Sequence, residues 1–494
     1  MGREEQIINE RKRKLNELCK AGINPYPHKF EQKNFSKEIK EEYKKLKNNQ
    51  RRKSKVKVAG RVMTKRDLGK LIFLIIQDSN GRLQLIFEKG NSAFDFIKKY
   101  IDIGDIIGAE GTVMKTKTGE ISVLVKSADI LSKSLLPLPE KWHGLKDDEE
   151  RYRKRYLDLI MNPEVKEVFQ KRTKILEAIR ELLKKKGIEE VETPFLQTIY
   201  GGAAARPFKT HLNALDIDLF LAISPELYLK RLIVGGYDRV YTISRNFRNE
   251  GIDRWHNPEF TMMEIYEAYA DYNDMMNLFE EIYEYACKKI NGTTKVNFRG
   301  KMIDFKIPWK RMTMNQAIKK WAGINVEKMS DRELIEFADK NKVEIKERNW
   351  GWAMQGIFEH FCKDKLEQPT FITDHPLETT PLCKKHRNEK LNRLIERFEP
   401  FCMGAEMGNA YSELNDPILQ RKLLEEQQKL LSKGYEDANP LDEDFLQAIE
   451  TGMPPCGGLG LGIDRMIMLL TGQDTIKDVI LFPFMRPEEG GKIQ

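Results

Sequence analysis

Cysteine and histidine are scarce in this chain of 494 residues, which has six of the first and seven of the second. The cysteines are Cys19, Cys287, Cys362, Cys383, Cys402 and Cys456. They stand singly, without the regular spacing of a disulfide framework, so we expect reduced thiols in a cytoplasmic protein. The pairing of Cys383 with His386 cannot complete the tetrahedral ligand set of a structural zinc. The sequence therefore predicts no zinc.

Long apolar runs are also missing. No apolar stretch approaches the roughly 20 residues that cross a membrane, and the polar start lacks the apolar core of a signal peptide. Hydrophobic residues make up 40% of the chain, which is enough for a sizeable core, while 32% of residues are charged. We expect a cytoplasmic protein of two or more folded units with no membrane partner.

Positive charge is in excess, and it is concentrated near the N-terminus. The net charge is +8. Residues 1–58 hold 18 Lys and Arg against 8 Asp and Glu, so the rest of the chain is slightly acidic. Such a segment is most often a solvated helical face, and less often an electrostatic footprint for a polyanion. We expect residues 1–50 to form a basic helical extension, with both roles left open.

Short alternating strands follow this basic segment, with one helix among them. The strands are expected over 56–63, 71–77, 83–87, 106–113 and 121–125, and the helix over 92–100. Asn80-Gly81 and Thr118-Gly119 lie between strands, where a hairpin favours residues that tolerate positive φ. Five strands with a helix after the third are typical of an OB-fold. We therefore predict an N-terminal five-stranded OB-fold β-barrel over residues 51–133.

Two side chains of this barrel are candidates for nucleic-acid contact. Phe73 and Gln84 lie on adjacent predicted strands joined by the Asn80-Gly81 turn. An aromatic ring that stacks on a base, beside an amide that reads the edge of a base, is a plausible recognition pair. The alternative is that Phe73 belongs to the barrel core, since its neighbours are apolar. The sequence leaves both interpretations open.

A proline-containing segment, residues 134–150, is expected to be a linker. Beyond it, residues 151–494 alternate strand-like apolar runs with amphipathic helices. The longest helix is expected over 164–186, with Pro163 just inside its start and Gly187 at its end. Residues 291–368 read as an insertion without an assigned function. The chain is thus predicted to be an α+β multidomain protein.

Two segments of the large domain combine arginines, carboxylates and glycines. The first runs from Arg245 to Tyr266, and the second is a glycine-rich stretch from Gly457 to Arg465. Guanidinium groups suit phosphates, and separated carboxylates suit ammonium groups. The glycine spacing does not match the G-x-G-x-x-G pattern of dinucleotide-binding turns. This inventory suits a polyphosphate, a base and a small zwitterion held together, and it indicates ATP-driven activation of a carboxylate.

These segments resemble the sequence motifs of class II aminoacyl-tRNA synthetases. Pro194, after a helix and a strand, resembles the first motif, residues 247–264 the second and residues 460–465 the third. Five further strings are similar to lysyl-tRNA synthetases in particular, at 201–208, 224–231, 248–272, 368–373 and 408–416. The resemblance covers about residues 56–483. It implies an anticodon-binding OB-fold and a catalytic domain whose antiparallel sheet is flanked by helices.

The resemblance assigns roles in ATP binding to residues of matching type. Arg248 and Arg465 would be the catalytic partners of the α- and γ-phosphates. Phe260 would stack on adenine. The full set implied for ATP is Arg248, Glu250, His256, Phe260, Glu406 and Arg465. Glu399 and Glu406 resemble the ligands of Mg²⁺, a cation that prefers hard oxygen atoms and would accompany ATP as substrate.

The resemblance likewise implies a pocket for L-lysine. Glu226 and the backbone at Gly202 would hold the α-ammonium, and Glu413 with Tyr266 would read the ε-ammonium. The full set is Gly202, Glu226, Arg248, Glu264, Tyr266, Asn409, Tyr411 and Glu413. A dry pocket with a carboxylate for a distal ammonium rejects neutral amino acids, because they leave that carboxylate buried and unpaired. An aspartate pocket would need a cation there, so Glu413 favours lysine.

The remaining expectations concern partners and rival functions. The resemblance implies tRNA(Lys) as substrate, with Phe73, Gln84 and Glu120 as anticodon readers, and a homodimer formed through the helix over 164–186. The amphipathic pattern of that helix fits packing within its own subunit equally well. Three rivals stay open: a protein-modifying lysyl ligase, a non-enzymatic RNA-binding module and a synthetase for another amino acid.

Overall fold

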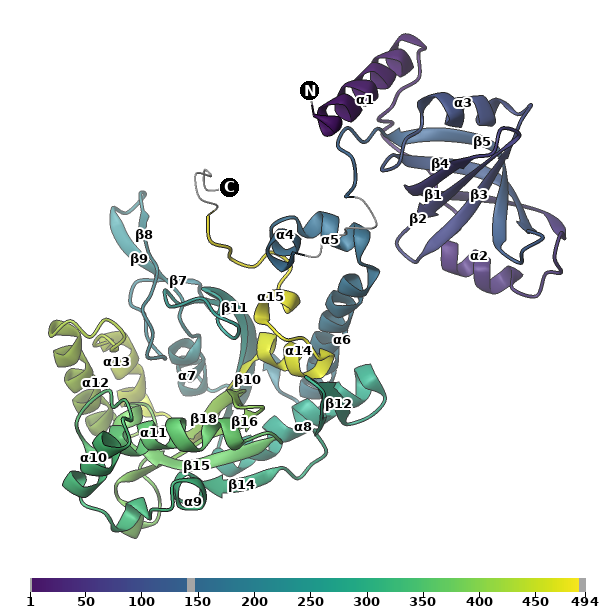
Figure 1. Ribbon diagram of the computed structural model, residues 1–494. Helices are drawn as coiled ribbons and strands as arrows, with labels where there is room; N and C mark the ends of the chain where they lie inside the picture. The colour runs from purple at the N-terminus through teal and green to yellow at the C-terminus, as the bar shows by residue number, and fades with distance from the viewer. Residues whose placement is uncertain (1, 140–146, 488–494) are drawn as a thin grey trace. The chain divides into compact units, whose positions relative to one another are not determined.

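The computed structural model describes residues 2–139 and 147–487, and it separates into two compact units, 1–145 and 146–494. Each unit is labelled by element in Figure 1. Part of the expected linker, residues 140–146, lies outside the described residues. The helix α4 (Asp148–Arg153) begins within residues 134–150, so the last residues of that segment are helical. In the described residues, no helix is long and apolar enough to span a membrane.

The first unit is a closed barrel in the strand order β1-β2-β3-β5-β4. Its strands are β1 (Arg51–Asp67), β2 (Leu71–Gln77), β3 (Arg82–Glu88), β4 (Ile106–Lys115) and β5 (Ile121–Ser132), with α3 (Ser92–Tyr100) after β3. Burial alternates along β2, where Ile72, Leu74 and Ile76 enter the core. This period of two is what a strand with one face inward requires. The predicted five-stranded OB-fold barrel is confirmed.

Helices from the basic N-terminal segment pack on the barrel. They are α1 (Arg3–Lys20) and α2 (Ser36–Tyr43). Arg11 is buried and donates to the carbonyl oxygens of Ile103 and Leu136, each at 2.7 Å. Lys14 Nζ lies 2.6 Å from a carboxylate oxygen of Asp102. Two of the six basic residues in α1 therefore help to attach this helix to the barrel.

The second unit is built on a large mixed sheet. In spatial order its strands are β14 (Lys310–Thr313), β15 (Thr370–Pro376), β16 (Leu394–Cys402), β18 (Gly408–Ser412), β19 (Cys456–Gly462), β11 (Glu259–Ala268), β10 (Arg239–Phe247) and β6 (Glu189–Glu190), with β17 (Ala405–Glu406) beside β16. All neighbouring pairs are antiparallel except β14 with β15 and β10 with β6. This agrees with the expected antiparallel sheet of the catalytic domain.

Helices cover both faces of this sheet (Figure 1). On one face α6 (Pro163–Lys185) packs against α8 (Tyr272–Asn291) and α14 (Ile463–Thr471) over the largest core cluster. Gly187 ends the α6 segment with φ of +72°, a conformation that glycine adopts without strain. The other face carries α7 (Glu226–Val234) and α11 (Trp350–Phe361). The buried stripe of α6 thus packs within its own subunit.

The alternation of side chains along the central strands explains where polar groups gather. In β11, Met263 and Ile265 enter the core under α6 and α8, so Glu264 and Tyr266 point to the opposite face. In β19, Leu459 and Leu461 enter the same core. The glycines that alternate with them carry no side chain on the opposite face, where the side chains of Glu413 and Tyr266 lie close to Gly458. The sequence pattern of these two strands therefore creates one hydrophobic face and one concave polar face.

The segment 291–368 contributes more to the fold than an appended insertion would. It holds β12 (Lys295–Phe298), β13 (Lys301–Asp304), α9 (Met314–Trp321) and α10 (Asp331–Lys340), as well as β14 and α11. β14 forms the edge of the main sheet by pairing in parallel with β15. Ser330 caps α10 and forms a capping box with Glu333. This segment is partly integral to the catalytic sheet.

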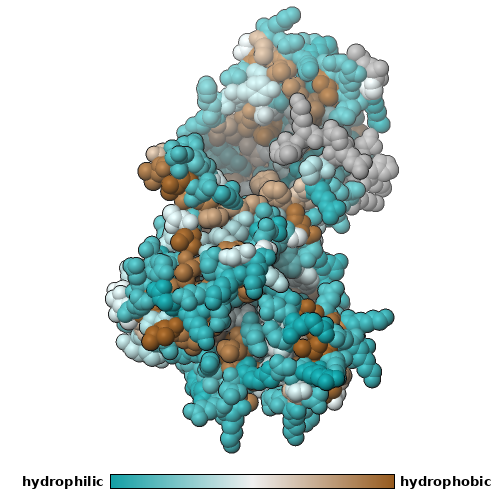
Figure 2. All heavy atoms as spheres, turned by 90° about the vertical axis from the view of Figure 1, so that its left-hand side faces the viewer, coloured by the Kyte–Doolittle hydropathy of each residue, from teal (hydrophilic) through white to brown (hydrophobic). Residues whose placement is uncertain are grey.

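The remaining elements complete the second unit around the sheet. They are α5 (Arg155–Met161), β7 (Leu196–Gln197), β8 (Lys209–Leu212), β9 (Ile217–Leu221), α12 (Pro417–Ser432), α13 (Glu443–Gly452), α15 (Ile476–Val479) and four 3₁₀ turns at Val326–Lys328, Lys363–Lys365, Leu377–Thr379 and Glu389–Leu391. The face drawn in Figure 2 is largely hydrophilic, with hydrophobic side chains in separate groups. This agrees with the high charged fraction of the chain.

Candidate active site

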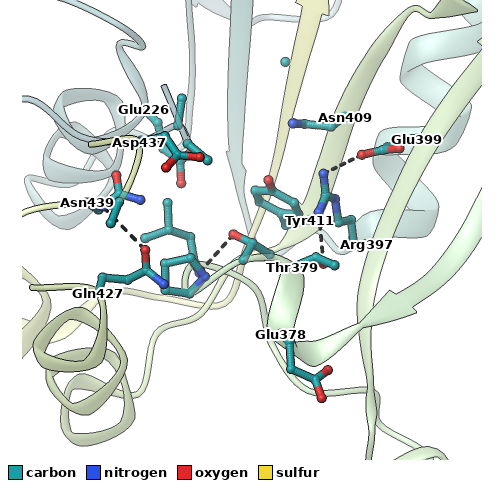
Figure 3. Close-up of a pocket in the computed structure, with 18 of the residues that line it drawn as sticks. Glu226, Glu378, Thr379, Arg397, Glu399, Asn409, Tyr411, Gln427, Asp437 and Asn439 are labelled. Carbon is teal, nitrogen blue, oxygen red and sulfur yellow. Dashed lines mark hydrogen bonds and ion pairs between the residues drawn. The ribbon is translucent and has the colours of Figure 1, made fainter. Parts of the chain in front are cut away.

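An acidic cavity of about 450 Å³ lies on the polar face of the sheet. We call it the acidic cavity because three glutamates from different elements line it. They are Glu226 of α7, Glu264 of β11 and Glu413, which follows β18. All the residues expected to bind lysine line this one cavity: Gly202, Glu226, Arg248, Glu264, Tyr266, Asn409, Tyr411 and Glu413. Figure 3 shows Glu226 on one side and Asn409 on the other.

Glu264 is held by two hydroxyl groups inside the cavity wall. Ser224 Oγ donates to Oε1 of Glu264 at 2.7 Å, and Tyr266 Oη donates to Oε2 at 3.2 Å. Burial raises the pKa of Glu264 to about 8, and the charge of Glu226 adds to this effect. Burial also raises the pKa of Tyr266 well above its usual value, so its hydroxyl stays a donor. The two hydroxyl groups therefore fix the orientation of Glu264. A positively charged partner would favour its ionised form.

Glu413 is fully buried at the floor of the acidic cavity. Burial raises its pKa to about 8 against the opposing effect of Lys230. Its Oε1 atom has no hydrogen-bond partner among the described residues. A Cβ atom built on Gly458 would lie only 2.0 Å from Oε1. Glycine at position 458 is thus required for this carboxyl group to occupy its place.

Gly202 brings the backbone close to Glu226 in the lining of the acidic cavity. Its φ is +85°, and a Cβ there would lie 2.8 Å from Ser224 Oγ and 2.9 Å from Glu226 Cβ. Only glycine combines this left-handed conformation with such close contact. The backbone at 202 can therefore share a ligand with the Glu226 carboxylate.

Lys230 is a component of this site that the sequence did not reveal. Its side chain is fully buried, and Nζ lies 2.6 Å from Glu226 Oε1 and 2.5 Å from Glu413 Oε2. A lysine on an amphipathic helix is usually solvated, so its type gave no reason to place it inside. The signal available in the sequence was the spacing of four residues between Glu226 and Lys230, which places the two side chains next to each other on a helix.

A second cavity, of about 180 Å³, adjoins the acidic cavity. We call it the arginine cavity. Its lining includes all the residues expected to bind ATP: Arg248, Glu250, His256, Phe260, Glu406 and Arg465. The two cavities share Arg248, Met262, Glu406 and Asn409. The guanidinium of Arg248 lies over the ring of Phe260 at 5.1 Å, and its Nε donates to the carbonyl of Ile223 at 3.3 Å. Arg248 thus stands at the junction.

Arg465 and His256 are paired at the far side of the arginine cavity. Arg465 Nη2 lies 3.0 Å from His256 Nε2, and His256 Nδ1 lies 2.8 Å from a carboxylate oxygen of Asp253. Because a guanidinium can only donate, Nε2 accepts and Nδ1 carries the proton. Arg465 Nη1 also donates to the backbone oxygen of Glu406 at 2.7 Å. A carboxylate oxygen of the partly exposed Glu406 lies 3.7 Å from the same Nη1 atom, so Arg465 is oriented by His256 and Glu406 together.

The side chains of Glu399 and Glu406 lie on the same face of the β16–β17 hairpin. Phe401 pairs with Glu406, and Glu399 lies two residues before Phe401. Glu399 forms an ion pair with Arg397, which also donates to Thr379 Oγ1 at 3.1 Å (Figure 3). Burial raises the pKa of Glu399, while Arg397 opposes this effect. In the described part of the chain, no group of three or more His, Cys, Asp or Glu side chains gathers as a metal site.

The outer part of the acidic cavity is formed by segments that the sequence did not connect with a site. Lys346 and Trp352 come from the segment 291–368, and Asp437 follows α12. Lys346 Nζ lies 2.5 Å from Asp437 and 5.1 Å from the centre of the Trp352 ring. These contacts depend on tertiary packing between distant segments, so no local pattern could have indicated them.

The three residues expected to read an anticodon lie on the outward face of the barrel. Phe73 pairs with Ile86 and Gln84 pairs with Ile75, so Phe73 and Gln84 are diagonal neighbours on one face. Phe73 is half-buried and does not belong to the barrel core. Gln84 donates to Ser122 Oγ at 2.9 Å. Glu120 forms an ion pair with Lys40 of α2 at 2.9 Å and is 46% exposed.

Comparison with known protein families identifies the class to which this fold and these cavities correspond. A model described as class II tRNA synthetases for D, K and N matches residues 147–486, and one described as an OB-fold nucleic acid binding domain matches residues 56–131. The first match spans more than half of the chain. The fold and the paired cavities are thus those of a class II aminoacyl-tRNA synthetase.

Curated relatives narrow this class. The chain is 51% identical to a lysine–tRNA ligase of Clostridium novyi, with 97% of this chain and 94% of the relative covered. It is 50% identical to a lysine–tRNA ligase of Clostridium perfringens, with 98% of each covered, and 50% identical to one of Clostridium botulinum, with 98% and 96% covered. The chain belongs to the lysine–tRNA ligase family.

Proposed function

We propose that this protein activates L-lysine with ATP and transfers it to the 3′ end of tRNA(Lys). One observation carries the proposal: the buried glutamates Glu226, Glu264 and Glu413 are among the residues that line a cavity, and this cavity meets an arginine-bearing cavity at Arg248. Lysine brings two ammonium groups and one carboxylate, whereas ATP brings several negative charges. The acidic cavity suits the ammonium groups of lysine, and the adjoining arginine cavity suits the negative charges of ATP. Arg248, where the two cavities meet, suits the carboxylate of lysine.

The acidic cavity would hold lysine by charge and hydrogen bonding. Glu226 and the backbone at Gly202 receive the α-ammonium, and Glu413 with Tyr266 receives the ε-ammonium. Glu264 and Tyr411 line the space between, and Asn409 joins Arg248 on the α-carboxylate. An amino acid without a distal cation would leave Oε1 of Glu413 buried without a hydrogen-bond partner, which is costly. Selectivity therefore rests on burial of the carboxyl groups.

The arginine cavity would hold ATP. Arg248 and Arg465 bind its phosphates, His256 lies beside them, Phe260 stacks on adenine and Glu250 accepts from its amino group. Glu399 and Glu406 supply hard oxygen atoms on one face of a hairpin, which fits Mg²⁺. Bound with ATP, this ion would neutralise phosphate charge. No zinc is required by this arrangement.

The reaction would follow from positioning rather than from a protein nucleophile. The lysine carboxylate attacks the α-phosphorus of ATP, the bond to the β-phosphate oxygen breaks, and pyrophosphate leaves. The 3′-terminal hydroxyl of the tRNA then attacks the carbonyl carbon of the mixed anhydride, and AMP leaves. Arg248 spans both cavities, so it aligns the carboxylate with the phosphate and offsets the developing charge.

The barrel would select the tRNA. Phe73 stacks on an anticodon base, Gln84 reads the edge of a base and Glu120 is a further reader. We further propose a cytoplasmic enzyme divided into a basic extension over 1–50, a barrel over 51–133, a linker over 134–150 and a catalytic domain over 151–494.

A homodimer is a further part of this proposal. It is supported by apolar side chains that stay exposed near the α6 segment and the C-terminus, among them Phe195, Leu196, Phe482 and Phe484, which are 47–75% exposed. Large exposed apolar groups often mark an interface between proteins. Light scattering of the purified protein should give twice the mass of 57.7 kDa, whereas a monomer at micromolar concentration would contradict this part.

Aminoacylation of a tRNA(Lys) transcript with each of the twenty amino acids tests the function. We expect charging with lysine alone, dependent on ATP and Mg²⁺. Charging with another amino acid, or lysine transfer to protein without tRNA charging, would favour one of the rivals.

A further inference from the structure

Lys230 places an ammonium group of the protein between two carboxyl groups of the acidic cavity. It lies one helical turn after Glu226 in α7, and no part of its side chain is exposed. Its Nζ atom lies 2.6 Å from Glu226 and 2.5 Å from Glu413. These two glutamates come from segments almost two hundred residues apart. Lys230 therefore bridges two carboxyl groups that come from distant segments of the chain.

The charges around Lys230 explain why such a bridge is needed. Several titratable side chains share its electrostatic environment, from α7, β11, β18, β19 and the loop before β16. They are Glu226, Glu264, Tyr266, Cys383, Tyr411, Glu413 and Cys456. Three of these are carboxyl groups. Lys230 contacts two of them directly, Glu226 and Glu413, while the cation that acts on Glu264 is Arg248. Like charges in a buried site suppress one another's ionisation, and a nearby cation restores it.

The contact geometry leaves part of Glu413 for another partner. Lys230 approaches Oε2, whereas Oε1 lies beside Gly458 and has no hydrogen-bond partner among the described residues. A carboxylate accepts through both oxygen atoms. The bridge thus fixes the orientation of Glu413 while one of its oxygen atoms stays available.

We propose that Lys230 is a positioning residue for lysine selectivity, because its ammonium holds Glu226 and Glu413 in the orientation that receives the ammonium groups of the substrate. This inference rests on the proposed lysine-activating function of the cavity. Lys230 does not contact the reacting atoms. It acts through the two glutamates, and its effect is therefore on lysine binding and on the pH at which binding occurs.

Removal of this internal cation has a defined direction. The pKa of Lys230 is raised by its two carboxylate partners, which outweigh its burial, so it stays charged. Burial raises the pKa of Glu413, and Lys230 limits that rise. Without Lys230 the pKa of Glu413 rises further, and less of it is ionised at neutral pH. The KM for lysine then increases, most strongly at low pH.

The test is lysine-dependent ATP–pyrophosphate exchange by Lys230→Met between pH 6.5 and pH 9. A neighbouring opposite charge typically shifts a pKa by about 1–3 units, so we expect KM for lysine to rise about tenfold to a thousandfold at pH 7. The increase should shrink toward pH 9, while KM for ATP stays unchanged. An unchanged KM for lysine, or an increase that is the same at every pH, would overturn the proposal.

Arg231→Met is the matched control. It removes a cation from the next position of α7, whose partner Asp442 lies 2.8 Å away and outside both cavities. We expect its KM for lysine to match the wild type at each pH. If Lys230→Met does not fold, Lys230→Gln keeps a donor and takes its place in the same assay. Failure of both to fold would assign Lys230 to stability alone and overturn the inference.

The wild type separates failure of this inference from failure of the proposed function. A wild-type protein without lysine-dependent exchange would refute the function itself. A wild type that activates lysine, alongside a Lys230→Met variant with normal KM and a normal pH profile, would refute only the role of Lys230.

Discussion

The acidic cavity and the outward face of the barrel are two recognition surfaces that differ chiefly in burial. Glu413 and Glu264 have almost no exposed surface, whereas Phe73 is half-buried and Glu120 is 46% exposed. A buried polar group without its partner costs more than an exposed one, because water cannot replace the partner. The acidic cavity should therefore discriminate among ligands strongly, and the barrel face should contribute through several moderate contacts.

The largest expected effect is that of Glu413→Gln. The amide keeps the shape but cannot neutralise the ε-ammonium of lysine, so we expect lysine-dependent ATP–pyrophosphate exchange to fall by about a thousandfold or more in kcat/KM. ATP binding should survive, because Glu413 does not line the arginine cavity. Glu426→Gln, at the exposed outer edge of the acidic cavity, is the control. Near-normal exchange by Glu413→Gln would exclude Glu413 from lysine recognition.

The second largest effect is expected for Gly458→Ala, which changes the shape of the acidic cavity. A methyl group in Gly458→Ala would collide with Glu413 Oε1 at 2.0 Å and with Tyr266 at 2.5 Å. We expect KM for lysine to rise about a hundredfold, because the displaced carboxyl group no longer meets the ligand. Gly462→Ala in the same strand, whose Cβ would meet its nearest neighbours at 3.6 Å, should leave KM for lysine within about threefold of wild type. Equal effects of both substitutions would refute this geometry.

The pH dependence of lysine binding should be smaller but systematic. Glu264 and Glu413 both have a pKa raised to about 8 in the free protein. Because lysine binds the ionised groups, its affinity should increase from pH 6 to about pH 8.5. Without lysine the same groups change stability in the opposite sense. Their contribution is fully present below the unfolded pKa near 4.5 and is lost as pH rises toward 8.

Thermal unfolding tests the pH dependence of lysine binding and the pH dependence of stability at once. We expect the rise in Tm caused by saturating lysine to be larger at pH 8.5 than at pH 6. The barrel face, whose readers are not buried carboxyl groups of this kind, should show no matching dependence in tRNA binding between these pH values. A lysine-induced rise in Tm that is independent of pH would contradict the assignment of the two glutamates.

On the barrel face the largest effect is expected for Phe73→Ala. Loss of one stacked base costs about 1–3 kcal/mol, so kcat/KM for tRNA should fall about tenfold or more. Lysine-dependent ATP–pyrophosphate exchange should not change. Phe96→Ala removes another half-buried aromatic ring, on α3 of the same barrel, and serves as control. Equal tRNA charging by wild type and Phe73→Ala at limiting tRNA would exclude Phe73 from recognition.

The smallest effect is expected for Glu120→Gln. Glu120 and Lys40 form an exposed ion pair, and such pairs contribute about 0–1 kcal/mol. We expect tRNA charging to fall less than about fivefold, with a weaker effect at higher salt. A loss as large as that of Glu413→Gln would show that exposure does not separate the two surfaces.

The sequence predicted the periodic parts of the fold and the residue types of the site. The ranges 71–77 for β2 and 92–100 for α3 were predicted from the sequence and are found in the structure. They could be predicted because their hydrophobic periods are regular. The glutamates and arginines of the catalytic domain were selected through motifs, and each lines one of the two cavities. Their roles stay predictions until the variants are measured.

Other features depend on contacts that a local pattern does not carry. Lys230 looks like a surface residue of an amphipathic helix until α7 is packed against Glu413. Lys346 and Trp352 reach the acidic cavity only because the segment 291–368 folds back across the sheet. β14 is four residues long, and its place at the edge of the sheet is set by pairing with β15. Long-range packing decides all three.

The most direct measurement compares lysine with norleucine in ATP–pyrophosphate exchange. Norleucine has the same backbone and an apolar side chain of similar length, so it leaves Oε1 of the buried Glu413 without a partner. We expect kcat/KM for norleucine to be lower by about a thousandfold or more. Norleucine activated within tenfold of lysine would contradict the claim that buried carboxyl groups select the substrate.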